Sequence, residues 1–465
     1  MTRKQPKYRQ IMNEITAKIK SGEFPSSSRL PSERVLAKQL SVNRSTVIRS
    51  YEELTSLGIL KRKRGSGTYV SSDYNPISIG QTNWYQMISA QHFTKKHYYQ
   101  NKIENNKYGA MDLYTGELSS DLIPNFNFPA FDWANIAQKN QDTSGLIDLK
   151  LAVCQHLAQQ NIQVTPEEVL ITSGARQALF LLLQVLLSPG DAVAIENPSF
   201  LHDLPLFQTA GVKAIKIPLN LENESIDLLQ LEEQLHKIKL LILNPNFHNP
   251  TGMTLSLANR KKLIALCQSY QVPIIEDDVF QLFNFSRQKI QTLKSLDTKN
   301  VIYLGSLSKL LGKNINIGWC VAPDFIVNKL AAARELMDFN LNIFPQMIAA
   351  EAFNSPQFDE KIKQLNLSLL DKYQQTLSFL HQFPKWQVSL IKGGLYLWLT
   401  YQRELSVDEY DLFLQEKLLI APSFLFEDKY DALRINFTRI DDFAIFKERF
   451  ASVNAKLSNR VHSPS

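Results

Sequence analysis

The first 70 residues carry basic side chains that are suited to contact a polyanion. Arg44, Ser45 and Thr46 are adjacent, and the basic run KRKR ends at Lys63 and Arg64. A guanidinium can pair with the edge of a guanine base, whereas basic side chains in a loop can reach phosphate oxygens. This segment holds 15 Lys and Arg against 5 Asp and Glu, while the rest of the chain holds 36 against 40. The distribution favours a nucleic-acid partner for the N-terminal segment.

Three helices are expected to position these residues. The first has isoleucines at helical spacing and ends at the breakers Gly22 and Pro25. Ser32 can cap a short helix over residues 33–40, and Asn43 can cap the next one. Two helices joined by a short turn follow the helix-turn-helix plan, in which the N-terminus of the second helix enters a major groove. The core positions of the head are expected to be Val35, Leu36, Leu40, Val42, Val47 and Leu54.

A two-stranded wing is expected to follow the second helix. Ile59-Leu60 and Thr68-Tyr69-Val70 have strand composition, and Gly65-Ser66-Gly67 has the composition of a turn. A solvated hairpin would also explain a lone charge run, but this run follows a helix-turn-helix pattern. Ser32 and Glu33 are expected to cap and pair locally rather than to read bases. Residues 1–72 are therefore predicted to form an α+β winged helix-turn-helix domain.

From about residue 110 onward, β-rich segments alternate with helical ones. The predicted strands are 169–172, 192–195, 240–243, 273–275, 301–304 and 315–321. This alternation indicates an α/β body over residues 111–465, with a mostly parallel sheet covered by helices. A long helical stretch beyond residue 345, followed by strands at 395–399 and 433–437, indicates a smaller α+β subdomain. Residues 73–110 have weak periodicity and are interpreted as a linker.

Composition excludes several classes of protein. The three cysteines, Cys154, Cys267 and Cys320, have no metal-ligand spacing, so no metal site is expected and a reducing compartment is favoured. The N-terminus lacks the apolar core of a signal peptide, and no apolar run is long enough to span a membrane. A cytoplasmic protein without a membrane partner is therefore expected.

Six motifs in the body could carry chemistry. They are SLSK ending at Lys309, IIED ending at Asp277, NPTG beginning at Asn249, SGAR from Ser173 to Arg176, ENPSF ending at Phe200, and LRIN containing Arg434. The SGAR segment lies between a strand and an apolar helix, where backbone N–H groups and the helix dipole can hold a phosphate. Taken singly, each motif has an ordinary explanation, such as an exposed loop lysine or a helix-capping aspartate.

The order and spacing of these motifs resemble known families. The head, with LPSERVLAKQLSVNRSTVIRSYEEL followed by KRKRGSGTYV, resembles the winged-helix domain of the GntR superfamily over residues 6–71. The body resembles the fold-type I aminotransferases over about residues 110–450. Together they are similar to the MocR/GabR-type subfamily of GntR regulators. The resemblance implies a DNA-binding transcription regulator that senses a small molecule through an aminotransferase-like body.

The resemblance also implies roles for individual residues. The residues expected to contact operator DNA are Arg34, Arg44, Ser45, Thr46, Lys63, Arg64, Gly65, Ser66 and Gly67. The implied cofactor is pyridoxal 5′-phosphate, which Lys309 would hold in a Schiff base. Asp277 would pair with the pyridinium nitrogen, Asn249 would donate to the ring 3′-oxygen, and Arg434 would bind a ligand carboxylate. The remaining implied cofactor contacts are Phe200, which would stack on the ring, and Ser173, Gly174, Ala175, Arg176, Ser306 and Ser308.

Two positions depart from the family pattern. Asn316 stands where the family has an arginine that binds the cofactor phosphate, and Phe280 stands where many relatives have a tyrosine near the 3′-oxygen. Loss of a charge-assisted phosphate contact costs about 1.5–3 kcal/mol unless another group, such as Arg176 or Lys313, replaces it. Both changes are expected to weaken cofactor binding.

Three functions therefore remain open. The first is a regulator that senses an amino acid or other carboxylate through bound cofactor. The second is a working aminotransferase with a DNA-binding head, and the third is a regulator whose body binds no cofactor. In each case, double-stranded operator DNA is the expected partner of the head, and the likeness to fold-type I proteins implies a homodimer.

Overall fold

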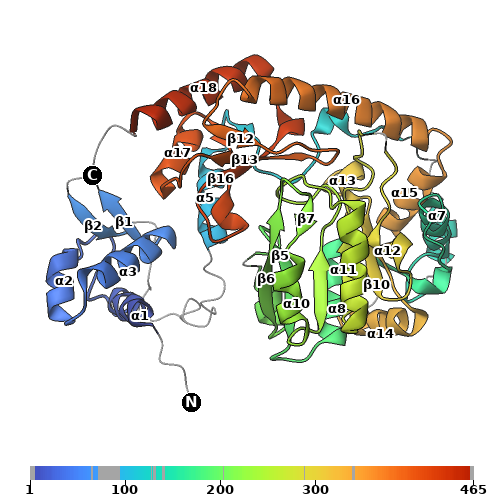
Figure 1. Ribbon diagram of the computed structural model, residues 1–465, viewed down its shortest axis with the longest axis horizontal. Helices are drawn as coiled ribbons and strands as arrows, with labels where there is room; N and C mark the ends of the chain where they lie inside the picture. The colour runs from blue at the N-terminus through green and yellow to red at the C-terminus, as the bar shows by residue number, and fades with distance from the viewer. Residues whose placement is uncertain are drawn as a thin grey trace. The chain divides into compact units, whose positions relative to one another are not determined.

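The computed structural model describes residues 6–63, 66–71, 95–126, 128, 132–138, 142–202, 204–286, 288–337 and 341–460 (Figure 1). The chain forms two compact units, Met1–Asn105 and Asn106–Ser465.

The first unit contains the expected winged helix-turn-helix. Its helices are α1 (Lys7–Lys20), α2 (Glu33–Gln39) and α3 (Arg44–Ser56), and its wing pairs β1 (Leu60–Lys63) with β2 (Gly67–Val70) in antiparallel register. Both predicted N-caps are confirmed: the Ser32 side chain accepts from the Val35 N–H, and the Asn43 side chain accepts from the Ser45 N–H. Glu33 does pair within the head, but with a residue distant in sequence: its carboxylate lies 3.1 Å from the guanidinium of Arg62 on β1.

The head core is mostly as predicted, with one error. Leu36, Val47 and Leu54 are buried, and Leu40 and Val42 are partly buried against them. Val35 was expected in the core but is 49% exposed. Successive residues of a helix point about 100° apart, so the side that buries Leu36 turns its neighbour toward solvent.

Part of the segment interpreted as a linker, 73–110, is helical. α5 (Lys95–Asn106) lies within the first unit up to Asn105. Tyr99 is buried, and a Cβ added at Gly58 would lie 2.8 Å from the Tyr98 ring, so α5 packs beside the end of α3. Its sequence, KKHYYQNKIENN, has no apolar stripe, which explains why its pattern did not predict a helix.

The second unit is built on an eight-stranded sheet. Its strands in spatial order are β4 (Val169–Thr172), β11 (Gly318–Val321), β10 (Val301–Ser306), β9 (Ile274–Asp277), β8 (Leu240–Leu243), β5 (Ala192–Asn197), β6 (Lys213–Asn220) and β7 (Ser225–Ile226). β11 and β7 run antiparallel to their neighbours, and the other adjacent strands are parallel. All six predicted strands are present. The sequence did not predict β6 and β7, because β6 is largely half-buried or exposed and lacks a continuous apolar run.

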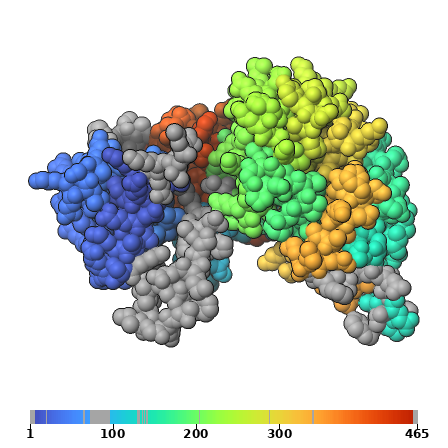
Figure 2. All heavy atoms as spheres, turned by 90° about the horizontal axis from the view of Figure 1, so that it is seen from below, coloured from blue at the N-terminus to red at the C-terminus, as the bar shows by residue number. Residues whose placement is uncertain are grey.

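Helices cover both faces of this sheet (Figure 1). α8 (Ala175–Leu186), α9 (Pro205–Thr209) and α14 (Asp324–Glu335) cover one face, and α10 (Leu228–Leu235), α11 (Leu257–Ser269) and α12 (Leu293–Leu296) cover the other. At one end of the sheet, α7 (Ile147–Ala158) packs against α15 (Ile343–Asn354), and the teal and orange segments lie side by side on the surface in Figure 2. A predominantly parallel sheet with two covered faces is confirmed.

The smaller α+β subdomain is also confirmed. Its four-stranded sheet has the order β12 (Trp386–Val388), β13 (Tyr396–Tyr401), β16 (Ala432–Asn436) and β15 (Ala421–Pro422). The helices α16 (Phe358–Leu380), α17 (Val407–Gln415) and α18 (Phe443–Arg460) accompany it, and aromatic rings such as Phe379, Trp386 and Phe450 fill the space between them. β3 (Met111–Asp112) pairs with β14 (Leu418–Leu419), so the start of the unit runs beside this subdomain.

Within the described part of the chain, no helix is both long enough and apolar enough to cross a membrane.

Candidate DNA-binding and cofactor sites

The N-terminus of α3 presents the polar residues of the predicted reading surface. Arg44 and Ser45 are exposed on its first turn, and Thr46 is half-buried beside them. Arg34 is exposed on α2. In the helix-turn-helix motif, the first turn of the second helix is the part that approaches base edges.

The described part of the wing is braced by Tyr69. The Ser66 hydroxyl lies 2.7 Å from the Tyr69 hydroxyl, and the Lys63 ammonium lies 4.9 Å from the centre of the Tyr69 ring. Gly67 has φ +115°, a conformation that favours glycine. Arg64 and Gly65, two of the predicted DNA contacts, lie outside the described residues.

Two arginines change the interpretation of the basic run. Arg62 pairs with Glu33 at 3.1 Å and approaches Glu52 at 3.9 Å, so it is engaged within the head. Arg29, which sequence reasoning missed, is exposed, and its guanidinium would lie 3.0 Å from a Cβ placed on Gly67. Its backbone bridges to the wing strand β2, a long-range pairing that the local pattern does not reveal.

In the second unit, the predicted cofactor residues follow the carboxyl ends of parallel strands. Lys309 lies in the short helix α13 (Ser308–Leu311) after β10, Asp277 ends β9, and Asn249 lies in the loop after β8. Ser173 follows β4, and Phe200 follows β5. Because parallel strands end at one edge of the sheet, these residues gather there, where ligands of open α/β sheets bind.

The Lys309 ammonium is paired with a carboxylate. Its Nζ lies 2.7 Å from Oε1 of Glu117, and the two side chains are 23% and 27% exposed. Glu117 comes from the segment after β3 and was not among the residues that the sequence suggested.

Asp277 carries a buried carboxylate at the end of β9. It is 6% exposed, and its Oδ1 accepts from the Val279 N–H at 3.4 Å. Burial, reinforced by Glu196, raises the pKa of Asp277 to about 7, although the charges of Arg176 and Lys309 oppose this effect. A cationic N–H partner would stabilise such a group in its ionised form.

Asn249 and Arg434 are brought together from distant parts of the second unit. The Arg434 guanidinium donates to Oδ1 of Asn249 at 2.8 Å and to the Tyr114 carbonyl at 2.5 Å. It also lies 4.3 Å from the centre of the Tyr396 ring. Because the amide oxygen of Asn249 is occupied by Arg434, its NH₂ group is the part available to donate to a ligand oxygen.

The SGAR segment forms the turn from β4 into α8. Gly174 has φ +84° and is the N-cap, with no side-chain cap bond. β11 passes close to this turn, since a Cβ on Gly318 would lie 2.8 Å from the Ala175 nitrogen. Ala175 is buried and Arg176 is exposed. The first turn of this helix can therefore offer backbone N–H donors to an anion.

The two serines of SLSK are used to shape the loop that follows Lys309. Ser306 donates to the Ile317 carbonyl at 2.7 Å, and Ser308 donates to the same oxygen at 3.0 Å. The Ser308 hydroxyl also accepts from the Ile317 N–H at 2.9 Å. It lies 3.8 Å from a Cβ built on Gly174, so the loop and the helix N-terminus are adjacent.

The remaining predicted positions lie around these groups. Phe200 is half-buried, and its N–H donates to the Asn249 carbonyl at 3.1 Å. Phe280 is buried and meets the Tyr396 ring edge-on at 5.4 Å. Asn316 and Lys313 are both exposed.

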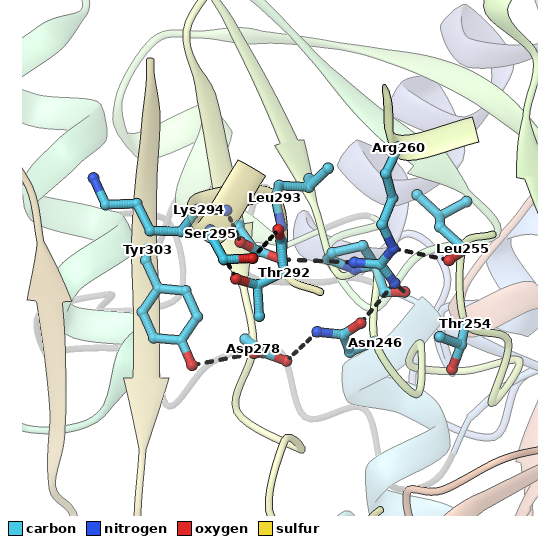
Figure 3. Close-up of polar contacts among 12 residues, drawn as sticks. Asn246, Thr254, Leu255, Arg260, Asp278, Thr292, Leu293, Lys294, Ser295 and Tyr303 are labelled. Carbon is cyan, nitrogen blue, oxygen red and sulfur yellow. Dashed lines mark hydrogen bonds and ion pairs between the residues drawn. The ribbon is translucent and has the colours of Figure 1, made fainter. Parts of the chain in front are cut away.

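A buried polar network fixes the strand ends beside Asp277 (Figure 3). Arg260 donates to the carbonyls of Leu255 and Pro245 and to Oδ1 of Asn246. Asn246 in turn donates to Asp278 at 2.8 Å, and Tyr303 donates to the same carboxylate at 3.1 Å. The network joins the ends of β8 and β9 to β10, which makes the positions of Asn249 and Asp277 well defined.

Comparison with known proteins agrees with this architecture. Residues 7–70 match the family "Bacterial regulatory proteins, gntR family", and residues 134–444 match "Aminotransferase class I and II". The HTH-type transcriptional regulator YisV of Bacillus subtilis is 31% identical over 93% of this chain and 92% of its own length. The HTH-type transcriptional regulator NorG of Staphylococcus aureus is 32% identical over 88% of this chain and 95% of its own. The chain is a GntR-type transcriptional regulator with an aminotransferase class I and II domain.

Solved structures show the fold of the regulator's second unit. The multiple substrate aminotransferase of Thermococcus profundus superposes with a TM-score of 0.72 at 23% identity, over 82% of this chain and 100% of that one. The kynurenine aminotransferase of Pyrococcus horikoshii gives 0.72 at 24% identity, over 80% and 98%. These structures confirm the fold-type I architecture, and the family match over residues 7–70 confirms the GntR resemblance.

The regulator's site contains residues that sequence reasoning missed. Glu117 contacts Lys309, Tyr396 packs against Arg434, and Asn244 donates to the Asp277 carbonyl at 2.7 Å. Asn244 lies five residues before Asn249, whose N–H it accepts at 2.7 Å, so its proximity to the NPTG motif was an available signal. Glu117 and Tyr396 reach the site from distant parts of the chain and had no such local signal.

Proposed function

We propose that this regulator holds pyridoxal 5′-phosphate at Lys309, senses an amino acid or other carboxylate at the same site, and alters its binding to operator DNA in response. When bound, the cofactor supplies an aldehyde that can link covalently to amines. The proposal gives the aminotransferase domain a sensory role.

The observation that carries the proposal is the buried carboxylate of Asp277 close to an amine. Burial raises the pKa of Asp277, and a protonated ring nitrogen would stabilise the ionised form of this carboxylate. The other groups fit the same ligand. The first turn of α8 suits the phosphate, the Asn249 amide suits the ring oxygen, and Phe200 suits the ring face. The exposed Arg176 or Lys313 can provide the positive charge that Asn316 lacks.

Arg434 suits the effector's carboxylate. Its guanidinium is buried, and its Nε has no hydrogen-bond partner among the described residues. A buried N–H without an acceptor is unfavourable, so an incoming carboxylate would gain a charge-assisted bond there.

The head is proposed to read operator DNA through α3 and the wing. The position of Arg44, Ser45 and Thr46 on the first turn of α3 supports contact with the major groove, and the position of Lys63 at the end of β1 supports contact with phosphates. A homodimer is proposed as the binding form. Ile147 and Leu151, one turn apart on α7, are 49% and 46% exposed, and Phe344 is 38% exposed on the adjoining α15. Exposed apolar side chains on adjoining helices suit a subunit interface.

The covalent link can be tested directly. Purified protein loaded with pyridoxal phosphate should show the visible absorption of lysine-bound cofactor, and borohydride should fix the label on the peptide that contains Lys309. Lys309→Ala should abolish both signals, while Lys262→Ala, at an exposed lysine of α11, should keep them. Absence of both signals in the wild type would favour a cofactor-free body, and rapid conversion of added amino acids would favour a working aminotransferase.

A further inference from the structure

The segment that follows β3 passes directly beside Lys309. A Cβ added to Gly116 would lie 3.7 Å from Nζ of Lys309 and 2.8 Å from the Tyr396 hydroxyl. The next residue, Glu117, places its carboxylate 2.7 Å from the same Nζ. The amine that would hold the cofactor is therefore already engaged with a carboxylate of this segment.

Glu117 is held in place by its neighbours. The buried Asn436 donates to the carbonyls of Thr115 and Glu117 at 2.9 and 2.7 Å. The Tyr396 hydroxyl donates to the Gly116 carbonyl at 3.2 Å. These bonds hold the backbone that carries the Glu117 carboxylate close to Lys309.

Covalent attachment of the cofactor and pairing with Glu117 both need the same nitrogen. Nζ as an ammonium carries three protons and donates to Glu117, whereas Nζ in a Schiff base keeps at most one of them. Attachment therefore weakens the bond to Glu117, and the ion pair opposes attachment by the interaction free energy that is lost. Its side chains are about one quarter exposed, so solvent screens the interaction less than it screens a pair on the open surface.

The same carboxylate favours exchange of Lys309 for an amine ligand. In that exchange, the ligand nitrogen forms a bond to the cofactor's carbon, and the bond from that carbon to Nζ breaks. The ligand enters as an ammonium and Lys309 leaves as one, so protons and charge balance and nothing is oxidised or reduced. The released ammonium returns to Glu117.

We propose that Glu117 is a positioning residue that competes with the cofactor for Lys309, loosening cofactor attachment and favouring exchange for an amine. This inference rests on the proposed function, because it concerns the same lysine. It makes Glu117 the group that keeps the sensor responsive to amines.

The test compares Glu117→Gln, which keeps the shape but loses the charge, with the wild type. Glu117→Gln should bind pyridoxal phosphate on the order of tenfold more tightly, as followed by visible absorption. It should also need on the order of tenfold more methylamine to displace half of the lysine-bound cofactor, as followed by borohydride trapping on Lys309. Glu117→Asp, which keeps the charge on a shorter side chain, should fall between the two. Glu224→Gln, which removes the partner of Lys392 in another ion pair, should leave both values unchanged.

The outcomes separate this inference from the proposed function. Equal or weaker cofactor binding by both Glu117 variants, with the wild type loaded normally, would overturn the role of Glu117 and leave the cofactor site intact. Lysine-bound cofactor in Glu117→Gln but not in the wild type would support the inference. Absence of lysine-bound cofactor from the wild type and all variants would overturn both. If Glu117→Gln fails to fold, Glu117→Asp decides by the same two measurements.

Discussion

Single residues set the electrostatics of the site, and Asp277 makes the stability of the cofactor-free protein depend on pH. Its pKa is about 7 in the folded protein, against about 3.9 for an aspartate in an unfolded chain. At pH values between these two pKa values, the carboxyl is protonated in the folded state and ionised in the unfolded state. The contribution of this group to stability is therefore complete below about pH 4 and is lost as pH rises through 7.

Asp277→Asn should remove this dependence, because an amide does not ionise. Cofactor-free Asp277→Asn should be more stable than the wild type at pH 8, by at most about 4 kcal/mol, and the gain should be smaller at pH 5. Urea unfolding at the two pH values measures both free energies. Asp371→Asn, at an exposed position, should show no such difference. An equal effect of Asp277→Asn at both pH values would contradict the assignment.

At the scale of elements, α3 and the wing should contribute to DNA binding in different ways. Arg44→Ala removes a side chain from the first turn of the recognition helix. It should therefore weaken binding to operator DNA by about 1–3 kcal/mol and relax the preference for particular bases. Lys63→Ala should weaken binding to operator and to unrelated duplex alike. It should also reduce the slope of log affinity against log salt concentration by about 1. Fluorescence anisotropy with both duplexes over a range of salt concentrations distinguishes these effects.

Arg62 provides the control within the same basic run. Because its guanidinium is paired with Glu33 inside the head, Arg62→Ala should reduce the salt slope less than Lys63→Ala does. If Arg44→Ala left discrimination between operator and unrelated DNA intact, α3 would not be the reading element.

At the scale of the whole molecule, the two units should be coupled thermodynamically. A ligand changes DNA affinity only if it binds the DNA-competent and DNA-incompetent arrangements unequally, and the coupling is reciprocal. Operator DNA should therefore shift the affinity for pyridoxal phosphate by the same factor as the cofactor shifts operator affinity. Couplings of about 1–3 kcal/mol correspond to roughly fivefold to 150-fold, which paired titrations can resolve.

These titrations should be made on the wild type and on Lys309→Ala, with light scattering to verify that each sample is a dimer. In Lys309→Ala the cofactor should no longer change operator affinity. Suppose that, in the wild type, the cofactor leaves operator affinity unchanged and the operator leaves cofactor affinity unchanged. That result would mean that the cofactor does not transmit a signal to the head.

The sequence by itself determined the features that depend on neighbouring residues. Side-chain caps at Ser32 and Asn43, apolar strands such as 240–243, and the turn from β4 into α8 follow from local sterics and hydrogen bonding, which a short window of sequence contains. The motifs around Lys309 and Asp277 could be assigned to the ends of strands for the same reason, since each follows a predicted strand in the sequence.

Only the tertiary structure decided which groups meet across long separations. The bond from Arg434 to Asn249 spans 185 residues, and the pairing of Lys309 with Glu117 spans 192. Neither has a local signature, because each depends on how the small subdomain and the segment after β3 pack beside the large sheet. The exposure of Val35 and the packing of α5 were likewise decided by neighbours that the local pattern does not specify. Sequence patterns therefore determined the types of groups at the site, and long-range packing determined their partners.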